Sequence, residues 1–158
     1  MRRYPATLMA SPLTSIRVHL VWATWHRRPW LDPEWRARLY AHLNGVAERK
    51  GAQLLCAGGV RDHVHLYLEC PETVALADLV HDLKSSSTRW IHRTFAHRKE
   101  FRWQEGYAGF SVARAGDAAL QDYIRNQEVH HRDRNFTAEY LSLLELHEVD
   151  YDPHSVLD

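Results

Sequence analysis

Two histidines, His63 and His65, lie two positions apart in an apolar run that is typical of a β-strand. Residues two apart on a strand leave it on the same face, so both imidazoles point one way while Val64 and Leu66 enter the core. Two imidazoles on one face suit two ligands of one metal ion. The chain has 12 histidines, so a surface pair that merely alternates with core residues explains the spacing equally well.

Tyr123 and Gln127 lie four positions apart in a segment with helical periodicity. Residues at this spacing differ by about 40° in rotation and about 6 Å along the helix axis, so both side chains share a face. A phenol with its usual pKa of about 10 is a poor nucleophile, but a Lewis-acidic ion that polarises a phosphate makes its attack feasible. The alternative is that Tyr123 is a core residue of an amphipathic helix and Gln127 a solvated side chain.

The apolar pattern predicts the elements that would position these residues. We expect strands over residues 16–25, 53–58, 64–69 and 107–113, and helices over 33–50, 76–97, 116–127 and 137–147. Asp32 supplies a capping residue for the first helix, and Pro33 its first position. The order β-α-β-β-α-β followed by helices predicts an α+β fold of the ferredoxin-like split βαβ type. Its antiparallel sheet carries helices on one face and leaves the other free, and a C-terminal helix bears Tyr123.

The net charge is zero, but the charges are unevenly distributed. All 20 lysines and arginines, and 14 of the 20 acidic residues, precede residue 136, which leaves a basic body and an acidic tail. Such a body fits phosphate binding, although a charge run is commonly just a solvated surface. We expect one domain over residues 1–135, followed by a short helix and an acidic tail over residues 136–158.

The two cysteines, Cys56 and Cys70, lie in or beside apolar strand-like runs and fit a reduced interior better than a disulfide framework. The longest apolar runs are only a few residues, so the sequence predicts neither a signal peptide nor a membrane span. We therefore expect a cytoplasmic protein.

Five segments in order resemble the small single-tyrosine transposases of the HUH class, found in the insertion-sequence 200/605 group and its REP-associated relatives. The segments are HLVWATWHRRPWL (19–31), DHVHLYLECP (62–71), LVHDLKSSSTRWI (79–91), WQEGYAGFSV (103–112) and DYIRNQEVHH (122–131). The resemblance extends over residues 19–131, which is most of the chain, and the ordered set is far more specific than any single segment.

This resemblance implies roles for particular residues. His63 and His65 match the paired ligands of Mg²⁺ or Mn²⁺, Tyr123 the nucleophile, and Gln127 the third metal ligand. Gly116 occupies the linker that in the family joins the tyrosine helix to the body, although a glycine before a helix is equally explained as a turn. The family acts on single-stranded DNA with hairpin or palindromic ends and forms a 5′-phosphotyrosine link. It works as a homodimer whose active sites can be shared between subunits.

Basic and aromatic residues near the expected site are candidates for DNA contacts, because cations follow phosphates and bases stack on aromatic rings. These candidates are Arg27, Arg28, Lys84, Ser85, Arg89, Trp103 and Arg114. A serine run in a helix is also explained as an exposed face, and Trp103 as a core residue.

The leading hypothesis from the sequence is therefore a metal-dependent tyrosine transposase. The alternative is a host-retained relative that binds DNA hairpins and regulates without transposing. A replication initiator or relaxase of the same class is disfavoured by the short chain.

Overall fold

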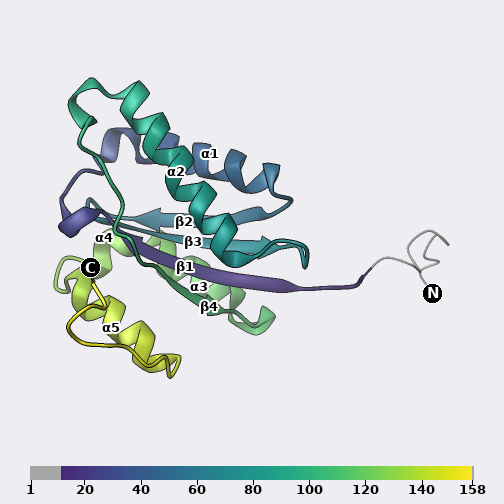
Figure 1. Ribbon diagram of the computed structural model, residues 1–158. Helices are drawn as coiled ribbons and strands as arrows, with labels where there is room; N and C mark the ends of the chain where they lie inside the picture. The colour runs from purple at the N-terminus through teal and green to yellow at the C-terminus, as the bar shows by residue number, and fades with distance from the viewer. Residues whose placement is uncertain (1–11, 158) are drawn as a thin grey trace.

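The computed structural model describes residues 12–157, which form a four-stranded antiparallel sheet with helices packed against it (Figure 1). The strands β1 (Ile16–Ala23), β2 (Gln53–Gly59), β3 (His63–Cys70) and β4 (Ala108–Ser111) lie in the order β2-β3-β1-β4. The helices are α1 (Pro33–Arg49), α2 (Leu76–Thr94), α3 (Asp117–Arg125), α4 (Gln127–His130) and α5 (Phe136–Leu146). The expected α+β class and ferredoxin-like strand order are confirmed.

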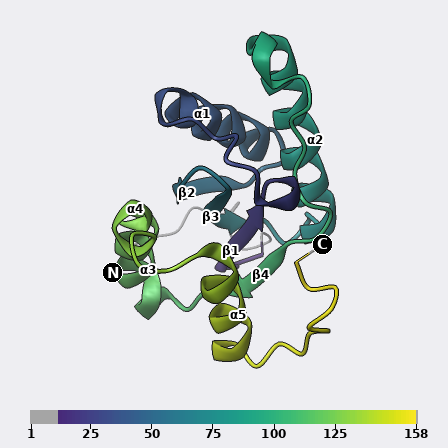
Figure 2. The ribbon, with the colours of Figure 1, turned by 90° about the vertical axis from the view of Figure 1, so that its left-hand side faces the viewer.

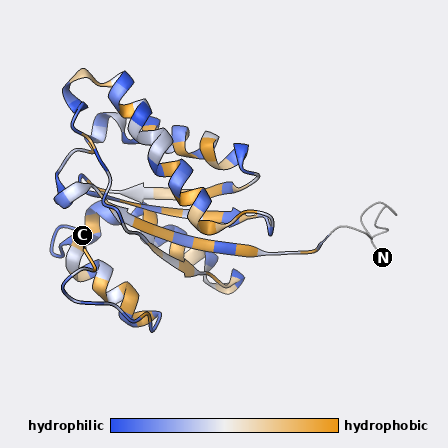
Figure 3. Cartoon of the chain, viewed as in Figure 1, coloured by the Kyte–Doolittle hydropathy of each residue, from blue (hydrophilic) through white to orange (hydrophobic). Residues whose placement is uncertain are grey.

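The main core lies between the sheet and the helix pair α1 and α2, and Figure 3 shows hydrophobic residues concentrated along the strands. Alternate residues of β1 and β3 enter this core, among them Trp22, Val64 and Leu66, all fully buried. Strand alternation then sends their neighbours to the other side of the sheet. Val21 of β1 pairs with His65 of β3 across the two central strands. Since Val64 and Leu66 are buried in the main core, strand alternation fixes the histidines on the opposite face of the sheet.

The sequence pattern led us to expect that the second face of the sheet would be free. It is instead covered by α3, α4 and α5 (Figure 2). A smaller core explains this, because Phe136, Tyr140 and Leu144 of α5 pack on Val21 and Phe110 of the sheet. We expected residues 136–158 to form a short helix and an acidic tail outside the main domain, whereas α5 packs on the sheet and helps to cover this face. We retain residues 1–135 as a proposed transposase domain, to which α5 is added as a packed helix.

The expected helix over residues 116–127 divides at Asn126, so Tyr123 lies on α3 while Gln127 begins α4. Asn126 leaves helical geometry with ψ of 20°, and its side-chain amide donates to the Asp122 carbonyl at 2.8 Å. Asparagine disfavours helix interiors because its side chain bonds to nearby backbone groups. The helix over 76–97 is also shorter than expected and ends at Thr94.

Asp32 does not form the expected side-chain cap of α1. Its carboxylate instead accepts hydrogen bonds from Arg98 at 2.6 Å and from the Trp35 indole at 3.2 Å. A charged guanidinium is a stronger partner than a backbone amide, so the carboxylate ties the start of α1 to the turn after α2.

Some expectations concern residues outside the described part of the chain, namely the first eleven residues of the domain and Asp158 of the acidic tail. Among the helices of residues 12–157, none combines the length and apolar character that crossing a bilayer requires.

Gly58 sets how closely the tyrosine-bearing helix approaches the sheet. A Cβ atom at this position of β2 would lie 2.2 Å from the carbonyl oxygen of Ile124 in α3. Atoms cannot approach so closely, so only glycine permits the observed packing of α3 on β2.

We expect Gly58→Ala to lower the free energy of unfolding by about 1–3 kcal/mol, the usual cost of overpacking. Urea denaturation measures this change. The control is Gly45→Ala in α1, where the nearest atom is a flexible Arg49 nitrogen at 3.6 Å. That variant should gain about 0.5–1 kcal/mol from helix propensity. A Gly58→Ala protein as stable as the wild type would show that α3 is free to shift.

Candidate active site

His63 and His65 lie side by side on β3 and are completely buried. One ring nitrogen of each is already engaged, since His63 Nδ1 lies 2.7 Å from Asp62 Oδ1 and His65 Nδ1 lies 2.8 Å from His19 Nε2. Such partners fix the orientation of a metal-binding imidazole. Both remaining Nε2 atoms therefore face the same space between the sheet and α5.

Glu139 of α5 places its carboxylate in this space. Its Oε1 lies 2.9 Å from His65 Nε2, 3.3 Å from His63 Nε2 and 3.0 Å from His131 Nε2. Burial raises the pKa of this carboxyl, but the hydrogen bonds from His131, His63 and His65 together hold it well below its usual range. Glu139 is thus an ionised carboxylate inside the protein.

The local sequence explains why Glu139 points inward. Phe136 and Tyr140 flank it at helical spacing and pack on the sheet, so Glu139 lies on the apolar face of α5. The helix starts at Asn135, whose side chain accepts a hydrogen bond from the Ala138 amide at 2.9 Å. Cap and apolar face together orient the carboxylate.

Gln127 completes the polar cluster from the side of α4. Its Oε1 lies 3.0 Å from His63 Nε2, and its amide nitrogen donates to Glu139 Oε2 at 3.1 Å. The side chain is buried, although the break at Asn126 separates it from the helix of Tyr123. The structure therefore brings together the predicted residues His63, His65 and Gln127.

Tyr123 lies on the other side of the same carboxylate. Its hydroxyl donates a hydrogen bond to Glu139 Oε2, and its ring meets that of His65 edge to face at 5.7 Å. Burial and the neighbouring Glu139 raise the pKa of this phenol above its usual value. Tyr123 is thus held protonated, with its hydroxyl proton directed at the Glu139 carboxylate.

The histidines of the cluster differ in charge. Burial lowers the pKa of His65 to about 4 and that of His19 to about 3, so both are neutral near pH 7. Burial opposes charging of His63 too, but hydrogen bonds to Asp62 and Glu139 raise its pKa to about 9. With no ion bound, His63 thus supplies the positive charge that balances Glu139.

The donor set fits a divalent ion. One ligand atom each from His63, His65 and Glu139 lie within 4.8 Å of one another, and all three residues are buried. Two imidazole nitrogens with carboxylate and amide oxygens form a mixed site suited to first-row divalent metals. Among the described residues, this is where such ligands converge.

The tyrosine helix docks on its own chain and presents Tyr123 to the histidine pair of the same chain. Arg17 on β1 contacts Asp117, the first residue of α3, at 2.5 Å, and the Tyr67 hydroxyl donates to the same carboxylate at 2.8 Å. Arg36 of α1 contacts Glu128 of α4 at 2.5 Å. Ion pairs therefore hold both ends of the α3–α4 segment, with the Gly58 contact between them.

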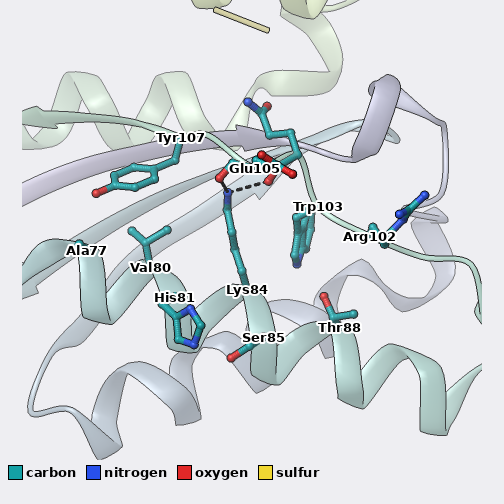
Figure 4. A pocket seen from close by; sticks show the side chains of 11 residues that line it. Ala77, Val80, His81, Lys84, Ser85, Thr88, Arg102, Trp103, Glu105 and Tyr107 are labelled. Carbon is teal, nitrogen blue, oxygen red and sulfur yellow. Dashed lines mark hydrogen bonds between the residues drawn. The ribbon is translucent and has the colours of Figure 1, made fainter. Parts of the chain in front are cut away.

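Two predicted DNA-binding residues have partners inside the protein. Lys84 donates to the carbonyls of Gln104, Glu105 and Gly106 at 2.6–3.1 Å beside a cavity of about 570 Å³ (Figure 4). Burial lowers the pKa of Lys84 to about 8. Trp103 is also buried, and its indole donates to Ser87 Oγ at 2.9 Å. Ser85 lines the same cavity and, like Lys84, is only partly buried.

The other predicted contacts are spread over the surface. Arg27 and Arg28 are exposed in the turn after β1, where Arg28 lies over the Trp25 ring at 5.5 Å. Arg89 is exposed on α2 and Arg114 in the turn before α3, so these two lie on different faces. Gly116 has helical angles, and its nearest neighbour to a Cβ would be 3.9 Å away, so the backbone shows no requirement for glycine there.

Glu139, His19 and His131 were not predicted as site residues from the sequence. Glu139 was counted only among the charges of the acidic tail. A signal for it existed, because it falls with Phe136, Tyr140 and Leu144 on the apolar side of a helical pattern, where an unpaired carboxylate is rare. His19 pairs with Phe110 and Tyr67 across the sheet, contacts that require the strand order to be known.

Comparisons with known proteins agree on one family. The model of the family described as "Transposase IS200 like" matches residues 12–127. The transposase of insertion sequence IS200 from Salmonella typhimurium is 28% identical over 116 residues, which cover 70% of this chain and 76% of the relative. The corresponding protein of Salmonella typhi is equally similar.

Solved structures show the same fold. A candidate transposase from Deinococcus radiodurans R1 is 28% identical, with a TM-score of 0.62 over 80% of this chain and 98% of that one. A REP-associated tyrosine transposase bound to a REP hairpin is 17% identical, with a TM-score of 0.59 over 96% of this chain and 92% of that one. The α5 segment lies beyond the residues that the family model matches.

We expect Asp117→Asn to loosen the docking of α3 and to speed amide hydrogen exchange in residues 120–125. The hydrogen bond from Tyr67 and the charge of Arg17 hold the pKa of Asp117 below its usual value, against the effect of burial. This stabilisation is present above the unfolded pKa of about 4 and is lost as the pH falls through the lower folded value. The difference between variant and wild type should therefore shrink in acid.

The matched control is Asp122→Asn on the exposed side of the same helix, where the carboxylate forms a long ion pair with Arg125 at 3.8 Å. It should exchange like the wild type. Equal exchange in both variants would show that the Asp117 pair does not hold the helix.

Proposed function

This chain belongs to the IS200-like family of single-tyrosine transposases, and we propose on that basis that it cuts and rejoins single-stranded DNA with Tyr123 as the nucleophile. One observation carries the proposal, namely that Glu139 binds the Tyr123 hydroxyl through one oxygen while its other oxygen faces His63 and His65. Nucleophile, proton acceptor and metal ligands thus meet around a single carboxylate.

We propose that His63, His65 and Gln127 bind Mg²⁺ or Mn²⁺ and that Glu139 Oε1 is a further ligand. The inward Nε2 atoms of the histidines and the Gln127 oxygen surround this carboxylate oxygen. When bound, the ion orients and polarises the scissile phosphate. The mixed nitrogen and oxygen donors suit Mn²⁺ somewhat better than Mg²⁺, which prefers oxygen ligands alone.

The chain's own residues supply the proton transfer. Tyr123 attacks the phosphorus through its phenolic oxygen while its proton passes to Glu139 Oε2. The bond from phosphorus to the 3′ oxygen breaks, and that oxygen takes up a proton to leave as a 3′-hydroxyl. A phosphotyrosine remains on the 5′ side of the downstream strand and conserves the phosphodiester, so a later 3′-hydroxyl reverses the step without an energy source.

Positive charge near the site supports DNA as the substrate. A cavity of about 480 Å³ next to the cluster is lined by three arginines, Arg27, Arg61 and Arg134, together with the acids Asp62 and Glu128. The guanidinium groups suit the phosphates on either side of a cut. We retain four residues as proposed contacts of DNA further from the site: Arg28, Ser85, Arg89 and Arg114. Lys84 and Trp103 would contribute by shaping the cavity that they line together with Ser85.

A REP-associated relative of the same fold is bound to a REP hairpin in its solved structure, and we propose that this chain also recognises hairpin or palindromic ends. We further propose that it acts as a homodimer in the cytoplasm. Docking of Tyr123 at its own chain's histidines supports a subunit whose active site is formed in cis. Gly116 is the proposed hinge through which the helix would exchange between subunits.

Tyr123→Phe should abolish covalent attachment of single-stranded DNA, because the variant lacks the attacking oxygen. Denaturing gel electrophoresis of protein incubated with Mn²⁺ and labelled oligonucleotides from the DNA flanking the gene measures the adduct. Tyr151→Phe is the control, since among the described residues the partner of the Tyr151 hydroxyl is the exposed Glu145, at 3.4 Å. An adduct on the Tyr123→Phe protein would refute the assignment.

Glu139→Gln should weaken Mn²⁺ binding at least about 10-fold, the low end of the loss seen even for outer partners of metal ligands. Isothermal titration of the protein with MnCl₂ at neutral pH measures the affinity. Glu145→Gln, an exposed change on the same helix, should leave it unaltered. Equal affinity of both variants would exclude Glu139 as a ligand.

A further inference from the structure

A cavity adjoins Tyr123. It has a volume of about 530 Å³ and lies between β4, α3 and α5, in the region where Figure 2 shows α3 and α5 on the same side of the sheet. This volume is within the range of small-molecule sites, about 300–1,000 Å³. Tyr123 and Glu139 both line it, so the cavity opens directly onto the proposed point of attack.

The walls of this cavity are mainly apolar and aromatic. Phe110 stacks on His147, with ring centroids 4.3 Å apart and planes inclined by 17°. Leu120, Leu143 and Leu146 form much of the remaining surface, and Leu146 is 75% exposed although it is a large apolar side chain. A flat aromatic ligand would extend the stack and cover this leucine.

One cation stands at the rim. Arg134 lines the cavity and is held in place by donating to the Ala138 carbonyl at 2.9 Å and to the Ser142 hydroxyl. The cavity thus combines an apolar interior with a positive edge beside the nucleophile, which is the pattern of a base and its phosphate.

We propose that this cavity, the flanking-base pocket, holds the base of the nucleotide whose 5′-phosphate becomes joined to Tyr123. The inference rests on the proposed function, which places the phosphate at the Tyr123 hydroxyl. The base of the joined nucleotide is only one sugar away from that phosphate. The flanking-base pocket is the apolar space that Tyr123 lines. The larger cavity beside Lys84 is lined by none of the catalytic candidates.

The proposal gives α5 a role in substrate choice. Glu139, Ser142, Leu143 and Leu146 all come from α5, which lies beyond the segment matched by the family. The pocket selects by shape and stacking, while Ser142 and Ser111 offer hydroxyls to the edge of a base. Relatives with a different helix here would accept a different base after the cut.

The first test is a titration of the wild-type protein with each of the four deoxynucleoside 5′-monophosphates, followed by the leucine methyl signals in NMR spectra. We expect shifts of Leu120, Leu143 and Leu146 with at least one nucleotide, and none with inorganic phosphate. This measurement does not require cleavage. Shifts without covalent adducts would therefore support the pocket and count against the proposed reaction, whereas unmoved leucines with all four nucleotides would overturn the pocket.

The second test uses oligonucleotides that lack one base at a chosen position. Loss of the base just after the cut should slow adduct formation about 10- to 100-fold, the usual worth of one stacked base. Loss of the base just before the cut should have a smaller effect. Equal effects on the two sides would overturn the proposal while leaving the tyrosine reaction intact.

A variant separates base binding from general damage. His147→Ala removes part of the aromatic wall and should slow the reaction of the intact oligonucleotide, but should add nothing to the defect of the one lacking the base. His154→Ala, another exposed histidine near the C-terminus, should match the wild type on both. Equal slowing of both oligonucleotides by His147→Ala would show that the residue acts through the fold and not through the base.

Discussion

A buried, ionised carboxylate is stable inside a protein only when donors surround it, and this requirement determines much of the reactive face. Glu139 has three histidines at one oxygen and Tyr123 with Gln127 at the other. These partners come from β3, α3, α4 and the segment before α5. One charge thus brings together elements that are distant in the sequence. It acts together with apolar packing, since Ile124 of α3 packs with Tyr67 of β3 and α5 packs on the sheet.

The sheet separates two tasks. Its α1 and α2 side contains the larger apolar core, in which Trp22, Leu66 and their neighbours are closed to solvent. Its other side carries the histidines, whose burial is enforced by strand alternation with that core. Packing on one face of the sheet therefore holds the histidines on the other face in place. The histidines are further oriented by Asp62 and His19, which also lie on the central strands or next to them.

Much of this arrangement was predictable from the sequence. The period-two pattern around Val64 gave the strand and the common face of His63 and His65, and the structure confirms both. Helical spacing predicted that Tyr123 and Gln127 would lie together, which holds despite the break at Asn126. Glu139 was not predicted, because its partners lie more than 70 residues earlier or across a turn, and local periodicity carries no record of such contacts. The covered second face was not predicted for the same reason, because α5 packs on β1 and β4, which are distant from it in the sequence.

The close contact between Gly58 and the backbone of Ile124 has a consequence for how such proteins diversify. Because the contact involves both the main chain and the fully buried side chain of Ile124, the two sides of the contact are constrained together. A recombinant chain could take its tyrosine helix from one parent and its sheet from another. It would retain the fit only if the parent that supplies β2 also has a glycine at position 58. Exchange of modules between relatives is thus constrained at a residue that takes no part in the chemistry. The packing of this helix therefore requires a glycine on a strand that lies some 60 residues earlier in the sequence.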